Sequence, residues 1–427
     1  METSEAYLER KLAELRLLNG CLSTPLTLSA PVSVNDVIRH KFQLTAALKA
    51  EHALQHWADT ETDWSHTDRH RAGPFEFSYD YQRADLDVRG PDFYEFGDGI
   101  ACDTIYAASG MAAISALVLA SARSIDNAEI LVLAGSYGET QELIERHAGH
   151  LRLVTLGQAQ TSRRSKSSRR ILLLDSSAPA VAFDDALRGV AAELDLLIFD
   201  TTCFFGGSGR IRRVLRRARS AGVPVVLVRS HNKLDSLGAE YGRLGSVAFV
   251  FAEDDGAWGR GTAFGALPYQ TRDAVRLFGG AALPAHFPPF VGTPAYRALT
   301  MRRTAAILRN SRRASRHFVA ALAGLTAELN YVHGLYVTLA GRQELDEASA
   351  RRAAAAMSKD LGKAGLPIRH AGSFGFDFAA TEWFHDATTD RYSVRVAIPD
   401  LPTALWDDLA KAIAQWWSVN QRRCAAA

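Results

Sequence analysis

The stretch around Lys233 is the first place in this sequence where residue types and spacing suggest chemistry. Lys233 stands shortly after the apolar run Val223–Val228, and Ser230 precedes the lysine by three residues. A lysine at the end of a buried strand can form a Schiff base, and the hydroxyl can help to anchor a phosphate beside it. A lone lysine is more often a surface charge, so this residue has to be judged together with the other candidates.

A carboxylate occupies the equivalent place after another apolar run. Leu194–Phe199 is followed by Asp200 and then by Thr201 and Thr202. A carboxylate at a strand end can hold a protonated ring nitrogen or a metal ion. Its structural alternative is to cap the next turn.

The third candidate is an anion site at the start of a helix. Ser109, Gly110 and Met111 stand at the start of the alanine-rich helix predicted for residues 111–122. Backbone N–H groups and the helix dipole favour a phosphate there, although Ser and Gly are also common helix caps. The sequence has neither a G-x-G-x-x-G nor a Walker A motif, so dinucleotide and nucleoside triphosphate sites lack their usual support.

The fourth candidate is Arg395, inside the apolar run Tyr392–Ile398. An arginine there can grip a substrate carboxylate with two hydrogen bonds, or it can belong to a structural ion pair. A phosphate anchor, a carboxylate for a pyridinium nitrogen and a lysine for an aldehyde are together the requirements of pyridoxal phosphate. We therefore expect this cofactor, with Lys233 and Asp200 one strand–helix–strand step apart.

The elements that would position these residues form an α/β domain. Short apolar runs bounded by Gly, Pro, Asp or Ser alternate with helical stretches between about residues 79 and 251. Continuous apolarity predicts strands buried on both faces, as in a mostly parallel sheet whose ligands bind at the carboxyl ends of the strands. The predicted strands are Glu129–Ala134, Leu151–Leu156, Ile171–Leu174, Leu194–Phe199, Val223–Val228 and Ser246–Phe251.

The two ends of the chain have a different pattern of apolar residues from its middle. Residues 1–75 are predicted to be a helical N-terminal segment, 76–275 the large α/β domain, and 276–427 a smaller α+β domain. The predicted N-terminal helices are Glu9–Leu18 and Asp36–Trp57. The C-terminal elements are helices at Thr293–Leu322, Glu347–Ala364 and Thr403–Val419, and strands at Asn330–Leu339 and Tyr392–Ile398.

Two histidine pairs, His52/His56 and His66/His70, have the spacing of metal ligands on one helix face. No third ligand is identifiable, so polar residues on a solvated helix face are the preferred interpretation, and we predict no metal.

The basic stretches 163–170 and 210–219 raise nucleic-acid binding as an alternative to a solvated loop and helix face. The net charge of +2 favours the latter.

Composition indicates a protein without a membrane span. Hydrophobic residues make up 47% and charged residues 22%, and the N-terminus lacks a secretory signal. The uncharged window 104–122 is weakly apolar, and we interpret it as a loop and a buried helix rather than a span. The cysteines form no C-x-x-C motif and indicate a reduced, cytoplasmic protein without zinc or disulfides; they are Cys21, Cys102, Cys203 and Cys424.

The order of these motifs resembles the fold-type I pyridoxal phosphate enzymes, most closely the Cys/Met metabolism family of cystathionine γ-synthase, the β- and γ-lyases and methionine γ-lyase. The resemblance runs from about Tyr81 to Arg395. The matching segments are Tyr81-Gln82-Arg83, Ser109-Gly110-Met111-Ala112-Ala113-Ile114, Ser136-Tyr137-Gly138-Glu139-Thr140, Asp200-Thr201-Thr202, Ser230-His231-Asn232-Lys233, Gly372-Ser373-Phe374-Gly375 and Ser393-Val394-Arg395.

The resemblance implies an aminotransferase-like large domain, a smaller C-terminal domain and a role for each matching residue. Lys233 would hold the cofactor and then take the substrate's Cα proton, Asp200 would keep the ring nitrogen protonated, and Tyr137 would stack on the ring and assist proton transfer. The other implied contacts with the cofactor come from Ser109, Gly110, Met111, Thr202, Ser230 and Asn232, and those with the substrate carboxylate from Arg395 and Ser373. Tyr81 and Arg83 would reach the cofactor phosphate of a neighbouring subunit, which implies a homodimer or homotetramer.

The sequence also departs from the family pattern. Ala178 stands where the family has an asparagine near the cofactor's phenolic oxygen, and Asn232 replaces a phosphate-binding threonine. The resemblance thus implies a lyase or transferase that performs β- or γ-elimination or replacement on an α-amino acid, with a specialised substrate. The alternatives are an aminotransferase, a decarboxylase, a desulfurase or a pyridoxal phosphate-binding protein without catalysis.

Overall fold

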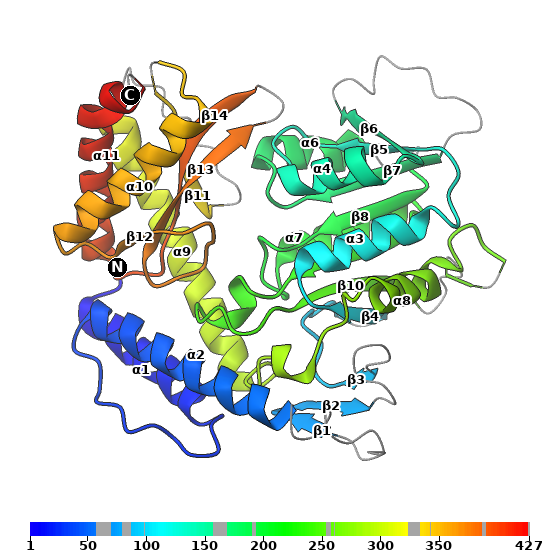
Figure 1. The fold of residues 1–427 in the computed structure, drawn as a ribbon, viewed down its shortest axis with the longest axis horizontal. Coiled ribbons are helices and arrows are strands. Elements are labelled where there is room, and N and C mark those ends of the chain that lie inside the picture. The colour runs from blue at the N-terminus through cyan, green and yellow to red at the C-terminus, as the bar shows by residue number, and fades with distance from the viewer. Residues whose placement is uncertain are drawn as a thin grey trace. The chain divides into compact units, whose positions relative to one another are not determined.

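The structure is a computed structural model of the chain. It describes residues 1–427 except 57–69, 79–86, 98, 157–168, 190–193, 253–257, 260, 323–333, 342, 387–389 and 426–427. The chain divides into two compact units (Figure 1). The terminal unit comprises Met1–Leu48, Ser236–Glu240 and Thr293–Ala427, and the central unit comprises Lys49–Asp235 and Tyr241–Gly292.

The core of the central unit is a seven-stranded sheet in the order β4-β10-β9-β8-β7-β5-β6. Only β10 runs against its neighbours, because it pairs antiparallel with both β4 and β9 while the pairs among β5 to β9 are parallel. The mostly parallel sheet is therefore confirmed. The strands are β4 (Ile100–Ala107), β5 (Ala128–Val132), β6 (Leu151–Thr155), β7 (Arg169–Asp175), β8 (Leu196–Asp200), β9 (Val225–Ser230) and β10 (Gly245–Ala252).

The loop predicted ahead of the alanine-rich helix is wrong at Thr104–Ala107, which belongs to β4. This strand lies at the edge of the sheet, and half-buried and exposed residues alternate along its first half. An edge strand has a neighbouring strand on one side only, so its side chains are less covered than those of an interior strand. It therefore needs no continuous apolar run. The pattern used to find the other strands could not detect it.

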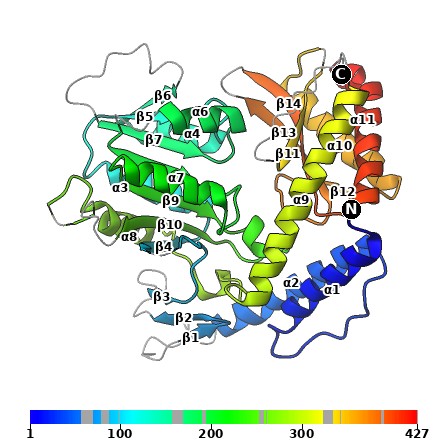
Figure 2. The same ribbon diagram turned by 180° about the vertical axis from the view of Figure 1, so that it is seen from behind.

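Helices cover both faces of this sheet, as Figures 1 and 2 show from opposite sides. One face packs on α3 (Gly110–Ser121), α4 (Gly138–His147) and α8 (Leu267–Leu277) through a large apolar cluster. The other face packs on α6 (Ala180–Gly189) and α7 (Gly209–Ser220). A separate small sheet consists of β1 (His70–Ala72), β2 (Phe75–Ser78) and β3 (Asp87–Arg89), and short 3-10 turns lie at η2 (Leu234–Ser236) and η3 (Pro284–His286).

The terminal unit is α+β, as predicted for the C-terminal part of the chain. Its four-stranded sheet has the order β11-β14-β13-β12, and all its pairs are antiparallel except β12 with β13. The strands are β11 (Tyr336–Leu339), β12 (Ile368–His370), β13 (Ala379–Asp386) and β14 (Arg391–Ala397). The helices are α1 (Ser4–Asn19), the first part of α2 (Val34–His56), α9 (Pro294–Ala321), α10 (Glu347–Lys363) and α11 (Thr403–Ala425).

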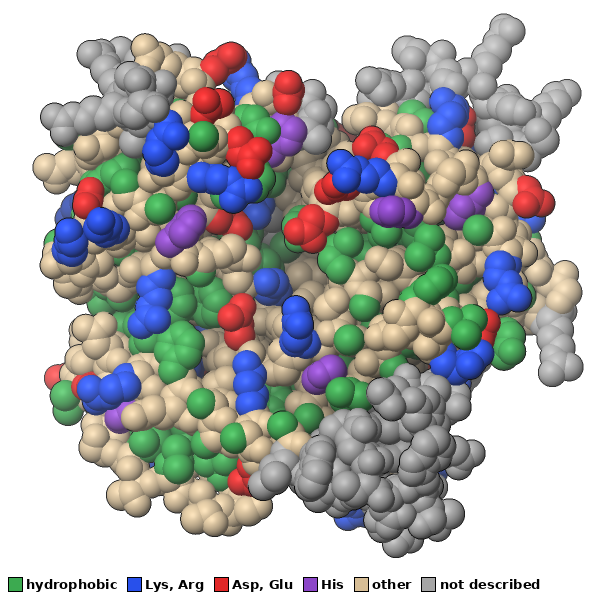
Figure 3. Space-filling view, in the orientation of Figure 1, with side chains coloured by type: hydrophobic (Ala, Val, Ile, Leu, Met, Phe, Trp, Pro, Cys, Tyr) green, Lys and Arg blue, Asp and Glu red, His purple; other side chains and the backbone are tan. Residues whose placement is uncertain are grey.

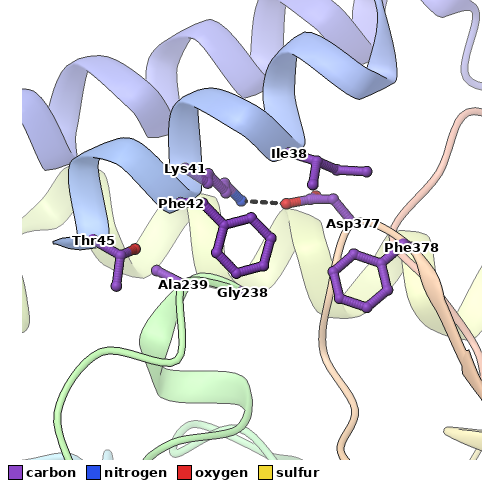
Figure 4. Close-up of a pocket in the computed structure, with 8 residues that line it drawn as sticks. All are labelled: Ile38, Lys41, Phe42, Thr45, Gly238, Ala239, Asp377 and Phe378. Carbon is purple, nitrogen blue, oxygen red and sulfur yellow. Dashed lines mark hydrogen bonds and ion pairs between the residues drawn. The ribbon is translucent and has the colours of Figure 1, made fainter. Parts of the chain in front are cut away.

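Buried ions join the N-terminal helices to the rest of the terminal unit. We call this group the terminal charge cluster: Arg10, Lys11, Glu14, Lys41, Arg303, Asp377 and Asp400. Lys41 on α2 forms an ion pair with Asp377 (Figure 4), with a nitrogen–oxygen distance of 2.7 Å. Arg303 on α9 lies 3.0 Å from Glu14 on α1. Arg10 contacts both oxygens of Asp400 at 2.7 Å. Each of these carboxylates contacts at least two cations, and Glu2 also contacts Arg10, so the four cations have four carboxylates as counterions.

Candidate active site at the carboxyl edge of the central sheet

Three neighbouring strands of the central sheet end in polar residues. Asp175 ends β7, Asp200 ends β8 and Ser230 ends β9, and these strands are parallel neighbours. The carboxyl ends of parallel strands meet at one edge, so the predicted residues Asp200 and Ser230 are brought together. The backbone N–H of Ser230 donates to Thr202 Oγ1 at 3.0 Å, which ties the two strand ends directly to each other.

Asp200 has a second carboxylate beside it. Asp175 and Asp200 are register partners in the β7–β8 pair, and Asp175 is buried. Asp175 accepts hydrogen bonds from the N–H groups of Tyr137 and Ser177, both at 2.6 Å, whereas Asp200 accepts one from the N–H of Thr202 at 2.8 Å. Burial first, and the negative charge of Asp175 second, raise the pKa of Asp200 to about 7.

The predicted phosphate turn lies against the end of β9. Ser109 is the N-cap of α3, and its side chain accepts from the N–H of Ala112 at 3.0 Å, so the capping alternative holds for this hydroxyl. Helix geometry leaves the N–H groups of Gly110 and Met111 without an acceptor inside the helix. A Cβ added to Gly110 would lie 2.8 Å from Ser230 Cβ, so only glycine permits the helix start to approach Ser230 this closely.

Lys233 lies in the loop between the end of β9 and the 3-10 turn η2, and it is half-buried. The adjacent Asn232 accepts a hydrogen bond from the N–H of Leu244 at 3.3 Å through its side-chain oxygen. The fold therefore brings the lysine loop, Asp200 and the start of α3 to one edge of the sheet. The contacts of Lys233, Asn232 and Thr202 with a cofactor remain predictions.

Tyr137 reaches the same edge through its backbone. It is the N-cap residue of α4, and its N–H donates to Asp175 at the end of β7. The residue is 37% exposed. Stacking on a cofactor remains a prediction for this residue.

The two predicted substrate residues belong to the terminal unit. Arg395 on β14 directs Nε and Nη2 to Glu382 Oε1 at 3.0 and 2.9 Å, and its guanidinium lies over the rings of Tyr336 and Phe384. The structural ion pair that the sequence left open is therefore present. Ser373 is buried. Their role toward a substrate remains a prediction, and Tyr81 and Arg83 lie outside the described residues.

Other candidates raised by the sequence have structural roles where they are described. On α7 the apolar side is buried, and Arg210 and Arg213 lie on another side, 3.5 Å from Asp184. On the face seen in Figure 3, basic and acidic side chains are interspersed. His52 is buried near the Tyr241 ring, and burial lowers its pKa. Residues 163–168 and the side chains of His56, His66 and His70 lie outside the described part of the chain.

Within the described residues, no group of three His, Cys, Asp or Glu side chains is arranged to hold a metal. No helix in that part of the chain is long and apolar enough to cross a bilayer.

A pocket in the terminal unit is lined by α2 and by residues of two loops (Figure 4), and the predicted site residues do not line it. Its lining residues are Ile38, Lys41, Phe42, Thr45, Gly238, Ala239, Asp377 and Phe378.

Sequence reasoning assigned no role to five residues of this site region. Asp175 ends an apolar run as Asp200 does, and that parallel was the signal that could have identified it. The other four form a buried hydrogen-bonded network: Arg229, His231, Asp235 and Ser246. The i, i+4 spacing of His231 and Asp235 and an arginine closing an apolar run were its only sequence signals.

Comparison with known proteins shows the fold. No protein-family model and no curated protein matches the chain. Among solved structures, a putative O-acetylhomoserine (thiol)-lyase from Campylobacter jejuni, solved with an N′-pyridoxyl-lysine-5′-monophosphate, aligns with a TM-score of 0.50 and 15% identity. The alignment covers 73% of this chain and 81% of that one. The predicted fold class, a large α/β domain with a mostly parallel sheet and a smaller α+β part, is thus confirmed.

Two further structures align less well. Cystathionine γ-synthase from Xanthomonas oryzae has a TM-score of 0.46 and 17% identity, over 74% of this chain and 82% of that one. Serine palmitoyltransferase from Sphingomonas wittichii has a TM-score of 0.48 and 15% identity, over 75% and 73%.

Proposed function

We propose that this chain binds pyridoxal phosphate at the carboxyl edge of the central sheet and is a lyase or transferase that acts on an α-amino acid. The observation that carries the proposal is the meeting of Asp200, with its raised pKa, the Gly110–Ser230 contact and the Lys233 loop at one edge. The C. jejuni structure of the same fold, with a pyridoxyl group on a lysine, supports the choice of cofactor.

The residues at this edge fit the three parts of the cofactor. The N–H groups of Gly110 and Met111, with the hydroxyl of Ser230, would hold the phosphate. Asp200 would face the ring nitrogen, and Lys233 would supply the amine for the carbonyl carbon. When bound, pyridoxal phosphate supplies an electrophilic carbonyl carbon and a ring that accepts electrons from the substrate's Cα.

Asp200 is suited to hold a proton on a ring nitrogen. Burial and the nearby carboxylate of Asp175 disfavour the ionised form of Asp200 and raise the pKa of Asp200 to about 7. A cation placed next to it would replace that repulsion by attraction and lower its pKa again. Asp200 would therefore be ionised in the loaded protein and would keep the ring nitrogen protonated.

Lys233 and Tyr137 would move protons during turnover. Lys233 Nζ would take the proton from the substrate's Cα. Tyr137, whose ring is exposed, would stack on the cofactor and assist proton transfer to the leaving group. Arg395 and Ser373 would hold the substrate carboxylate.

The proposed reaction is β- or γ-elimination or replacement on a specialised substrate. The motifs of the Cys/Met metabolism family support the reaction class. Two departures from those motifs support a different substrate: Ala178 is fully buried where an asparagine would approach the cofactor, and the side-chain oxygen of Asn232 is already bonded to Leu244. These positions alter the polar groups around the ring while the phosphate turn and Asp200 are retained.

The experiment is a screen of amino acids that carry a leaving group at Cβ or Cγ. The loaded protein should release an α-keto acid and ammonia in equal amounts, or a replacement product when a thiol is supplied. Lys233→Ala, loaded in the same way, is the control and should give neither. Formation of pyridoxamine phosphate would instead indicate transamination, and loss of carbon dioxide or transfer of sulfur would indicate a decarboxylase or desulfurase.

We also propose that the working form is a homodimer or larger, because Tyr81 and Arg83 would serve the cofactor phosphate of a neighbouring subunit. Light scattering of the loaded protein should give at least twice the mass of 46.6 kDa. A monomer with full cofactor occupancy would contradict this assembly.

A further inference from the structure

A buried chain of four polar side chains lies on both sides of Lys233 in the sequence. Arg229 donates to the two oxygens of Asp235 from Nε and Nη2, both at 2.7 Å. His231 Nδ1 lies 2.8 Å from Asp235 Oδ2, and His231 Nε2 lies 2.8 Å from Ser246 Oγ. All four residues are at most 2% exposed. We call them the lysine-loop network.

The proton positions in this network follow from its charges. Burial would raise the pKa of Asp235, but the charge of Arg229 and the bond from His231 lower it to about 2, so Asp235 is ionised. Burial lowers the pKa of His231, whose ring is therefore neutral. The carboxylate can only accept, so the ring proton is on Nδ1, and Nε2 accepts from the hydroxyl of Ser246.

The network connects three parts of the candidate site. Arg229 Nη1 donates to the backbone oxygen of Thr201, the residue after Asp200, at 3.0 Å. His231 and Asp235 are each two residues from Lys233. Ser246 follows Gly245, where an added Cβ would lie only 2.2 Å from the backbone oxygen of Ser109 at the start of α3. The network therefore fixes both sides of Lys233 relative to the carboxylate and the phosphate turn.

The Ser246–His231–Asp235 arrangement has the hydrogen-bond order of a serine nucleophile triad. A nucleophile has to meet its substrate, however, and Ser246 and His231 are 1% and 0% exposed. The ring of Phe93 packs on His231 with a centroid distance of 3.9 Å. A positioning role agrees with this burial, and a role in attacking a substrate does not.

We propose that the lysine-loop network consists of positioning residues that hold Lys233 Nζ where it would condense with the carbonyl carbon of pyridoxal phosphate, forming a C=N bond while the carbonyl oxygen leaves as water. The inference rests on the proposed function. A fully hydrogen-bonded, buried support reduces the conformational freedom that the loop must lose before reaction. Without the His231 bonds, the loop would still be connected to β9, but its reactive lysine would sample more positions.

The test compares His231→Phe and Ser246→Ala with the parent and with the surface control Asp184→Asn. His231→Phe keeps an aromatic ring against Phe93 and leaves the Arg229–Asp235 pair intact. Each protein, free of cofactor, is mixed with pyridoxal phosphate and cyanoborohydride, and the labelling rate of every lysine is read by peptide mass. Hydrogen exchange of residues 229–240 is measured on the same cofactor-free proteins.

We expect His231→Phe to slow labelling of Lys233 by about 10-fold or more, with labelling of exposed lysines such as Lys359 unchanged. Exchange in residues 229–240 should rise. Ser246→Ala, which loses one hydrogen bond, should show the same changes by about 2- to 5-fold. The Asp184→Asn control should match the parent in both measurements.

The outcomes separate this inference from the function on which it rests. If the parent does not label Lys233 preferentially, the proposed function fails. If the parent does so and a folded His231→Phe labels Lys233 at the parental rate, the positioning role is overturned. Should His231→Phe fail to give native circular dichroism, Ser246→Ala decides by the same comparison of Lys233 with Lys359.

Discussion

The terminal charge cluster and the Asp175–Asp200 pair both hold carboxylates that are wholly or partly buried, but their surroundings have opposite electrostatic effects. In the terminal charge cluster, lysine and arginine neighbours outweigh the effect of burial and lower the pKa values of Glu14, Asp377 and Asp400. At the edge of the central sheet, burial and a second carboxylate raise the pKa of Asp200. One cluster contains its own counterions, whereas the other would gain a counterion from a ligand.

This difference indicates which buried charges serve the fold and which serve a site. A buried ion that is fully paired contributes to the specific packing of the elements that it joins, here α1, α2 and α9. A buried carboxylate with a raised pKa costs stability unless something binds to it, and such groups concentrate at functional sites. The comparison therefore assigns the terminal charge cluster to structure and supports the proposal that Asp200 serves a site.

Substituting Asp200 by Asn should give the largest effect after loss of Lys233 itself. Asn has the same shape and can still accept from the N–H of Thr202, but it cannot hold a proton on a ring nitrogen by charge. With the amino acid identified by the screen, we expect kcat to fall by about 10²- to 10⁴-fold. A variant with the kcat of the parent would remove Asp200 from the chemistry.

Substituting Glu14 by Gln tests the structural side of the comparison. It leaves Lys11, Lys41 and Arg303 buried with fewer counterions, and should lower the free energy of unfolding by about 3–5 kcal/mol. Glu347→Gln is the control, because Glu347 is 49% exposed in its pair with Arg351 and should change the value by less than about 1 kcal/mol. Urea unfolding followed by circular dichroism measures both. Equal effects would refute the structural assignment.

The smallest expected effect is a gain in stability. The pKa of Asp200 is raised in the folded chain, so the folded state binds more protons than the unfolded state between about pH 4 and pH 7. Stability from this group is therefore lost as pH rises through that window. Asp200→Asn should stabilise the cofactor-free protein at pH 8 by on the order of 2 kcal/mol, less than the full pKa displacement because water reaches part of the carboxylate, and by little at pH 4.

Thermal unfolding at the two pH values measures this effect. Asp184→Asn, on the surface of α6, is the matched control and should shift little at either pH. A larger gain at pH 4 than at pH 8 would have the wrong sign and would contradict the raised pKa of Asp200.

Continuous apolar runs predicted the interior of the central sheet because parallel strands covered by helices must be apolar on both faces. All six predicted runs are strands, and Asp200 and Ser230, which end the parallel neighbours β8 and β9, lie at one edge as expected. The edge strand β4, the small strands β1 to β3, and β12 and β13 were not predicted. They are short or carry polar residues on an exposed face, so they lack such a run.

Contacts between side chains on different strands were harder to predict than the residues that end the strands. Asp175 meets Asp200 through strand register, and Arg395 meets Glu382 across the β13–β14 pair. Ser246 reaches His231 because β9 and β10 are antiparallel neighbours. Spacing along one sequence does not encode which strands lie side by side, so it identified the residues that end strands and not the groups that tune them.

The most direct test of the central claim is to find where pyridoxal phosphate attaches. The purified chain is loaded with the cofactor, its visible absorption is recorded, and borohydride reduction is followed by peptide mass mapping, alongside Lys233→Ala. We predict a band that borohydride bleaches, one pyridoxyl group per chain on Lys233, and neither band nor specific adduct in the variant. Pyridoxyl groups spread over surface lysines, or equal attachment to parent and variant, would contradict the account.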